Sequence, residues 1–168
     1  MINFDLSNRV AIVTGGAQGF GFAITERFIK SGAKVIIWDI DKKAAEEAID
    51  KLNSNNCSYQ IVDVINFDQI NKSLNDIEKK FGKIDIFINN AGIAGKNTTV
   101  AEYPLEEWNK VINLNLNAVF YCCKAVVPFM ALKSMNKNEI KKYKYSGALF
   151  KIKTNVTGIT QKKYNIRL

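Results

Sequence analysis

Hydrophobic runs alternate with amphipathic segments along the first 132 residues of this 168-residue chain. The apolar runs predict four β-strands, over residues 9–14, 34–39, 58–62 and 84–88. Between and after them, apolar residues recur three or four positions apart, which is the spacing of one helix face. This spacing predicts helices over residues 19–31, 42–52, 68–81 and 105–132.

The residues that can end or cap these helices stand where the periodicity predicts. Gly32 and Gly82 stand where the first and third helices should end, and Asp41 stands where a side chain can cap the second helix. Strands that alternate with helices favour a parallel sheet joined by right-handed crossovers and covered on both faces. The sequence therefore predicts a doubly wound α/β domain over residues 1–132.

The alternation of apolar runs with amphipathic segments ends after residue 132, and the charge balance changes at the same point. Residues 1–132 carry 14 Lys and Arg against 15 Asp and Glu, a net charge of −1. Residues 133–168 carry 10 basic residues against one acidic residue, a net of +9, so the chain's total of +8 comes from this segment. We expect residues 133–168 to form a basic, poorly ordered tail with at most one weak strand or helical turn.

Composition narrows the possible classes of protein. The chain has no histidine, and its three cysteines lack metal-ligand spacing, which argues against a metal site or a histidine-based triad. Reduced, buried thiols in a cytoplasmic protein are the simpler interpretation of the cysteines. Because the sequence holds neither a secretion signal nor an uninterrupted apolar run of about 18 residues, we expect no membrane association.

A glycine-rich turn follows the first predicted strand and leads into the first predicted helix. Glycines at such a turn let the chain bend tightly and let pyrophosphate oxygens approach N–H groups at the helix N-terminus. The turn therefore predicts a dinucleotide site. Its candidate cofactor-binding residues are Gly15, Gln18, Gly19, Phe20 and Gly21.

Asp39 ends the second predicted strand, 24 residues after Gly15. This is about the separation expected for a carboxylate that binds ribose hydroxyls. A carboxylate there would repel a 2′-phosphate, so the predicted cofactor is NAD rather than NADP. The simpler alternative makes Asp39 a strand-end or cap residue. Asp63 and Val64 follow the third strand, where they could contact adenine, and an ordinary turn is the alternative for Asp63.

These residues resemble the short-chain dehydrogenase/reductase family. Residues 14–21 resemble its T-G-x-x-x-G-x-G motif, residues 89–92 its N-N-A-G motif, and residues 113–116 the region that holds its catalytic asparagine. The resemblance covers residues 1 to about 132, roughly half of a family member, and implies a Rossmann-like sheet that lacks its C-terminal strands.

The resemblance also implies roles for individual residues. Asn90, Ala91 and Gly92 would line the nicotinamide side of the cleft, and Asn115 would be the catalytic asparagine of a proton relay. Each has a structural alternative: asparagines after a strand can satisfy backbone groups in a turn, and Asn115 in an apolar helix needs a hydrogen-bond partner. Without the rest of the relay, we expect a structural role for Asn115.

The family's reaction is hydride transfer between nicotinamide and a carbonyl or alcohol carbon of a small substrate. It uses a tyrosine with a lysine four residues later, together with a serine. Here Tyr143, Tyr145 and Tyr164 are not followed by lysine at that spacing, and Ser146 does not follow a glycine-led strand. The resemblance therefore implies that serine, tyrosine and lysine of the family site are absent from this sequence.

A change of reading frame would account for the loss. If residues 142–146 are encoded AAA TAT AAA TAT AGC, reading one base later gives Asn-Ile-Asn-Ile and then alanine, which resembles the family's fifth strand. We hypothesise that the tail is a frameshift product of a truncated gene. The fourth strand would then be an unpaired edge, which favours homo-oligomerisation or aggregation through that edge.

Two functions from different classes remain open. The first is an NAD-dependent oxidoreductase by descent, catalytically silenced in this chain. Residues 18–21, 38–39 and 102–108 resemble NAD-linked sugar-acid dehydrogenases, and 3-oxoacyl-carrier-protein reductases are the broader alternative. The second is a silent dinucleotide-binding or dimer-partner module. Nucleic-acid binding through the basic tail is less favoured, because its aromatic residues and lysines form no recognisable motif.

Overall fold

Four parallel strands form the centre of the fold, in the spatial order β3-β2-β1-β4. The structure is a computed structural model that describes residues 4–132; the predicted tail lies outside the described residues. The strands are β1 (Val10–Thr14), β2 (Lys34–Asp39), β3 (Cys57–Ile61) and β4 (Ile86–Ile88). The helices are α1 (Gly19–Lys30), α2 (Lys42–Leu52), α3 (Phe67–Phe81), α4 (Leu105–Ile112) and α5 (Ala118–Leu132), with the short turns η1 (Val100–Glu102) and η2 (Asn113–Asn117). The predicted parallel α/β fold is confirmed.

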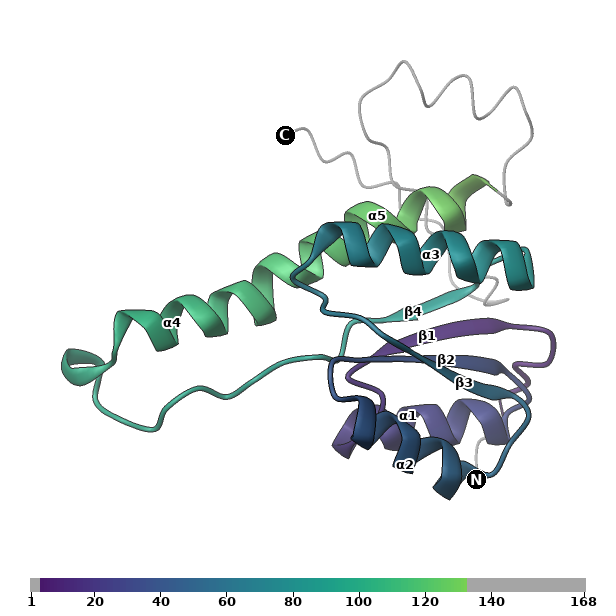
Figure 1. The fold of residues 1–168 in the computed structure, drawn as a ribbon, viewed down its shortest axis with the longest axis horizontal. Helices are drawn as coiled ribbons and strands as arrows, with labels where there is room; N and C mark the ends of the chain where they lie inside the picture. Colours follow the sequence, from purple (N-terminus) through teal and green to yellow (C-terminus); the bar gives the residue numbers. More distant parts are fainter. Residues whose placement is uncertain (1–3, 133–168) are drawn as a thin grey trace, which may run out of the picture.

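Helices cover both faces of the sheet. Figure 1 shows α1 and α2 on one side and α3 and α5 on the other. Alternate residues of β1 serve the two layers: Val10 and Ile12 pack in the cluster that includes α3 and α5, while Ala11 and Val13 pack toward α1. Burial on both faces explains why the central strands read as continuous hydrophobic runs.

The ends of the helices follow the predicted capping chemistry. The Asp41 carboxylate accepts a hydrogen bond from the Ala44 N–H at the start of α2, and Asn66 caps α3 through the N–H groups of residues 68 and 69. Gly82 ends α3 with a left-handed φ of 71°. Helix α3 therefore begins one residue before the predicted start, because the cap is Asn66.

Strand β4 is shorter than predicted and lies at an edge of the sheet. Its residues pair with Ala11–Val13 of β1. The ladder does not extend back to residue 84, because the Asp85 carboxylate accepts the Val10 N–H at 2.9 Å in place of a backbone oxygen. Within residues 4–132, β4 pairs with β1 alone, as expected for an edge strand.

The predicted single helix over residues 105–132 is interrupted. Its middle, η2, is a π-helical turn that separates α4 from α5. Such turns insert one extra residue and occur often at functional positions. Periodicity alone missed the interruption; Asn115 within this turn is bonded to a distant loop, as described below.

The stretch Leu105–Met130 is long and apolar enough, by length and composition, to cross a membrane. It is one such stretch within the described residues, and a core helix of a soluble protein can have the same composition. This stretch is therefore weak support for a membrane span.

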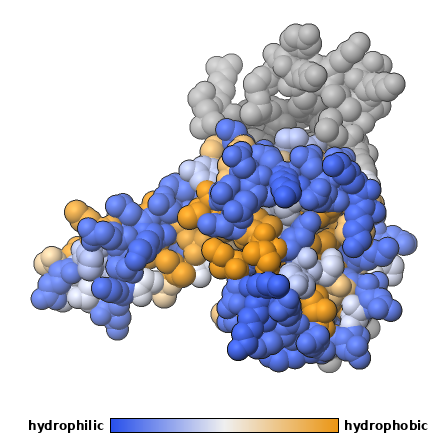
Figure 2. Space-filling model, viewed as in Figure 1, coloured by the Kyte–Doolittle hydropathy of each residue, from blue (hydrophilic) through white to orange (hydrophobic). Residues whose placement is uncertain are grey.

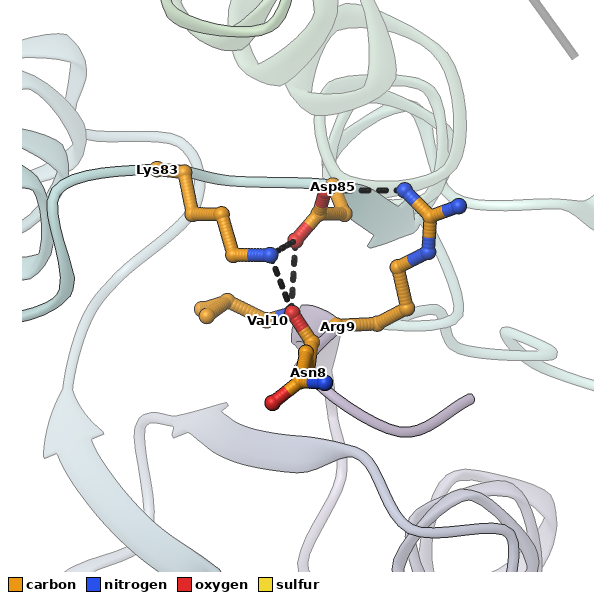
Figure 3. Close-up of polar contacts among 5 residues, drawn as sticks. All are labelled: Asn8, Arg9, Val10, Lys83 and Asp85. Atoms are coloured by element: carbon orange, nitrogen blue, oxygen red, sulfur yellow. Dashed lines mark hydrogen bonds and ion pairs between the residues drawn. The ribbon is translucent and has the colours of Figure 1, made fainter. Parts of the chain in front are cut away.

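An ionic cluster fastens the N-terminal end of β1 to the segment before β4 (Figure 3). The Asp85 carboxylate pairs with Lys83 at 3.0 Å and with Arg9 at 3.2 Å, and it also accepts the Val10 N–H. Lys83 in addition donates to the Asn8 carbonyl oxygen. Partial burial raises the pKa of Asp85, but these hydrogen bonds outweigh burial and hold the pKa below its usual 3.8.

We expect Asp85→Asn to lower the free energy of unfolding at pH 7 by about 1–3 kcal/mol, because a charged acceptor of three donors is lost. Because folding lowers the pKa of Asp85, its ionised carboxylate stabilises the folded state fully at pH values above the pKa of the unfolded chain. This contribution is lost as the pH falls through the pKa of the folded state. The wild-type advantage should therefore begin to shrink below about pH 4 and vanish only when the pH lies below the lowered pKa of Asp85. Urea denaturation of the wild type and the variant at pH 7 and at low pH measures the loss of stability and its dependence on pH. Glu47→Gln, which removes an exposed 4.0 Å pair with Lys51, is the control and should change stability little. Equal effects of the two substitutions would contradict this account.

Candidate functional site: the β1–α1 turn and its neighbours

The turn between β1 and α1 lies at the carboxyl end of the sheet and is shaped by glycines. Gly15 adopts a φ of 59° and its N–H donates to the Trp38 carbonyl oxygen at 2.7 Å, which ties the turn to β2. Gly19 has a φ of 52°, and a methyl group added there would meet no atom within 4 Å. The turn thus presents an open surface at Gly19.

Gly21 serves a different purpose, which is close packing. A methyl group added at Gly21 would collide with the carbonyl oxygen of Gly15 and with the side-chain amide of Asn90. The first turn of α1 can therefore rest against the preceding loop only if residue 21 has no side chain. This contact sets where the N-terminus of α1 points.

The N-terminus of α1 has no internal cap among the described residues. Its N-cap residue, Gln18, makes no side-chain hydrogen bond to the helix, and the first turn contains no acidic residue. By contrast, α2 and α3 are capped by side-chain oxygens. The free N–H groups and the positive end of the helix dipole are suited to an anion such as a phosphate.

Asp39 lies beside this turn at the end of β2. One carboxylate oxygen accepts the Ala17 N–H at 3.2 Å, and the other accepts the Asp41 N–H at 3.1 Å. Each oxygen keeps a further lone pair that can accept a hydrogen bond. The residue predicted to bind ribose is thus held next to the glycine-rich turn, and it also satisfies local backbone groups as the simpler alternative proposed.

Asp63 and Val64 follow β3. One Asp63 oxygen accepts the Ile65 N–H at 3.0 Å, which is the geometry of an ordinary turn. Val64 is buried and lines a shallow depression beside Thr14 and Ala91. Both interpretations of Asp63 stay open, because one carboxylate oxygen makes the turn and, within residues 4–132, the other is not part of that turn.

The segment after β4 is bonded directly to the glycine-rich turn. The Thr14 hydroxyl oxygen accepts the N–H groups of Asn90 and Ala91 at 2.9 and 3.0 Å. In return, the Asn90 amide donates to the carbonyl oxygens of Thr14 and Gly15 at 2.9 and 3.1 Å. The Asn90 side chain therefore braces the turn.

Asn115 is brought to the same loop by the π turn. Its amide oxygen accepts the Ile93 N–H at 3.0 Å, and its amide nitrogen donates to the Ile93 carbonyl at 2.8 Å. The hydrogen-bond partner expected for Asn115 is thus the backbone of Ile93. Gly92 lies beside it, since a methyl group there would come within 3.1 Å of the Asn115 oxygen.

The sequence does contain a signal for the missed π turn. Asn113 and Asn117 flank Asn115, and the Asn117 amide donates to the Asn113 side-chain oxygen at 2.8 Å. Three polar residues at every second position do not fit one face of a regular α-helix.

Reactive groups of other kinds are not assembled at this site. Burial raises the pKa of Cys122 to about 12 and that of Cys57 to about 11, so both thiols stay protonated at neutral pH. Within residues 4–132, no group of His, Cys, Asp and Glu side chains could hold a metal ion. The feature of this site that suits an anionic ligand is the start of α1, where Gln18 makes no side-chain cap.

Comparisons with known proteins give the same family as the motifs. The sequence model of the short chain dehydrogenase family matches residues 9–140. A probable NADP-dependent mannitol dehydrogenase of Yarrowia lipolytica is 41% identical over 127 residues, which are 74% of this chain and 46% of that protein. A 2-dehydro-3-deoxy-L-rhamnonate dehydrogenase (NAD(+)) of a Sphingomonas species is 36% identical, over 74% of this chain and 49% of its own length.

Solved structures agree with the relatives. The 3-ketoacyl-(acyl-carrier-protein) reductase of Brucella melitensis complexed with NADH superposes with a TM-score of 0.71 at 31% identity, covering 74% of this chain and 51% of that chain. The chain thus spans about half the length of the relatives that it matches. With its motifs and fold, the match over residues 9–140 shows that this chain belongs to the short-chain dehydrogenase family.

Proposed function

We propose that this chain binds NAD at the β1–α1 turn. The observation that carries the proposal is the juxtaposition of an uncapped helix N-terminus with the Asp39 carboxylate, which is anchored to the same turn through the Ala17 N–H. The N–H groups at the start of α1 would hold the pyrophosphate, and Asp39 would accept hydrogen bonds from ribose hydroxyls.

The choice of NAD over NADP rests on charge. A carboxylate at Asp39 would repel the 2′-phosphate of NADP, and no basic side chain contacts Asp39 among the described residues. The relatives include proteins named for either cofactor, so family membership alone leaves the choice open. The predicted adenine contacts of Asp63 and Val64 and the nicotinamide contacts of Asn90, Ala91 and Gly92 belong to the same proposal.

Bound NAD supplies hydride transfer to or from a carbonyl or alcohol carbon. The chain's own residues would bind and orient the cofactor, with Asn115 holding the Ile93 loop in place. The sequence has no tyrosine followed four residues later by lysine. We therefore propose a dinucleotide-binding chain of oxidoreductase type without turnover, with small alcohols, ketones or sugar acids as the substrates of its catalytically complete relatives. Free thiols at Cys57, Cys122 and Cys123 are suited to the cytoplasm.

Cofactor binding and hydride transfer can be measured separately. We expect the full chain to bind NAD and NADH in a calorimetric titration and to show no substrate-dependent change in NADH absorbance with a panel of sugar acids and short ketones. Turnover with any of these substrates would show that the chain supplies a proton donor by another route. Absence of NAD binding by a folded chain would overturn the proposed function.

Asp39→Asn tests the basis of cofactor choice. The amide keeps one acceptor for the Ala17 N–H but loses the charge, so we expect the NAD dissociation constant to rise about tenfold and the preference for NAD over NADP to shrink. Asp50→Asn, an exposed change on α2, is the matched control and should leave both constants unchanged. A variant that retains wild-type discrimination would show that Asp39 is only a structural residue.

Gly19 and Gly21 allow a second comparison. Gly19→Ala places a methyl group in open space at a left-handed φ, so it should cost about 1–2 kcal/mol of stability while weakening NAD binding more than tenfold. Gly21→Ala should destabilise the fold more, because the methyl group meets backbone oxygen. Thermal unfolding measures the loss of stability of each variant, and NAD titration measures its loss of affinity. Unaltered NAD affinity in Gly19→Ala would place the phosphates elsewhere.

A further inference from the structure

A polar side chain, Gln60, borders the apolar layer between the sheet and α3. It lies on β3, directly opposite Trp38 in the β2–β3 ladder. Figure 2 shows hydrophobic residues between the polar outer surfaces of α3 and α2, on the side of the molecule where β3 forms an edge of the sheet. Trp38 is fully buried in the cluster that the sheet shares with α3, and Gln60 is half-buried beside it.

The Gln60 amide oxygen accepts hydrogen bonds from two other elements. The Trp38 indole N–H donates to it at 3.0 Å, and the Ser73 hydroxyl of α3 donates to the same oxygen. Ser73 is itself buried. Because an indole N–H can only donate, its partner must be the amide oxygen, which fixes the direction that the Gln60 amide faces. One atom of β3 therefore joins β2 to α3.

Trp38 connects this network to the β1–α1 turn. Its carbonyl oxygen accepts the Gly15 N–H at 2.7 Å, and the residue after it is Asp39, whose carboxylate accepts the Ala17 N–H at 3.2 Å. The Trp38 ring also meets the Phe87 ring of β4 edge to face, with 5.5 Å between the ring centres. A shift of Trp38 would therefore move both the glycine-rich turn and the carboxylate that we propose to bind ribose.

We propose that Gln60 is a positioning residue for NAD binding and that it acts through the Trp38 indole. This inference rests on the proposed function of the β1–α1 turn. The hydrogen bond holds the large ring at one depth in the core, so the backbone at residues 38 and 39 keeps the position that the turn requires. Without the amide oxygen, the indole N–H would be a buried donor without a partner, and the ring would have to move to find one.

A purely structural role is the alternative for Gln60. In that case the amide would add to the stability of the core, and the folded chain would bind NAD equally well without it. Packing of α3 on the sheet is already supplied by three apolar side chains that are 0–2% exposed, Ile70, Leu74 and Ile77. The polar network instead ends at the residue that precedes Asp39, which favours a role in the site.

Gln60→Leu tests the proposal by calorimetric titration with NAD. Leucine fills a similar volume but offers no acceptor, so we expect the NAD dissociation constant to rise about five- to tenfold. Ile77→Val is the matched control, because it removes one methyl group from the same core, four residues beyond Ser73. This control should lower the midpoint of thermal unfolding and leave the NAD dissociation constant unchanged.

Trp38→Phe separates action through the indole from any other effect of Gln60. It keeps an aromatic ring but removes the N–H donor, so Gln60→Leu should weaken NAD binding by less than about twofold in a Trp38→Phe chain. Equal fold-changes in the two backgrounds would overturn the proposal, and so would an unchanged NAD dissociation constant in Gln60→Leu. If circular dichroism shows Gln60→Leu to be unfolded, Gln60→Asn replaces it. The shorter amide does not reach the indole, and it should weaken NAD binding in the same direction.

Tryptophan fluorescence gives a readout that needs no cofactor. The chain has two tryptophans, so in a Trp108→Phe chain the emission comes from Trp38 alone. We expect Gln60→Leu to change the emission maximum of Trp38, and Ile77→Val to leave it unchanged. An unchanged maximum in Gln60→Leu would overturn this inference alone, because the indole would then not depend on Gln60. A folded wild type that does not bind NAD would overturn the proposed function, and this inference with it.

Discussion

The arrangement of the site depends on a reciprocal set of hydrogen bonds between the ends of β1 and β4. The Thr14 hydroxyl accepts two N–H groups from the segment after β4, and the Asn90 amide returns two hydrogen bonds to the carbonyls of Thr14 and Gly15. Four bonds between two side chains and two loops fix the spacing of these loops. These bonds are partly buried, and losing either side chain would leave several polar groups without their partners.

This junction explains why the turn after β1 can be both open and rigid. The Asn90 amide donates to the Gly15 carbonyl oxygen, and Gly21 at the start of α1 packs closely against both that oxygen and the Asn90 amide. The α1 N-terminus is thereby aimed into solvent beside Asp39 without a capping side chain of its own. An uncapped helix end has a free-energy cost that a bound anion can offset.

Hydrogen bonds to the loop after β4 also position the helical segment formed by α4, η2 and α5. Asn115 reaches the loop after β4 through both atoms of its amide, and the π turn is the local distortion that permits this reach. The distortion also separates the buried face of α5 from the projecting face of α4. Helix α5 thus belongs to the core and Asn115 to the site, while α4 leaves Leu105 and Trp108 exposed.

Much of the fold and part of the candidate site could be predicted from the sequence by itself. Continuous apolar strands, helical spacing, glycine stops and the Asp41 cap determined the order of elements and the parallel sheet, since these are local properties. The sequence also indicated the glycine-rich turn, Asp39 and the partner that Asn115 would need. Only the tertiary structure decided which atoms those residues contact: that Asp39 holds the Ala17 N–H, that Asn90 braces Thr14, and that the helix over 105–132 contains a π turn. The Asp39 and Asn90 contacts join residues 22 and 76 positions apart, and Asn115 within the π turn bonds to Ile93, 22 positions away. Periodicity reports only on neighbours within one element, so it carries no information about such pairings.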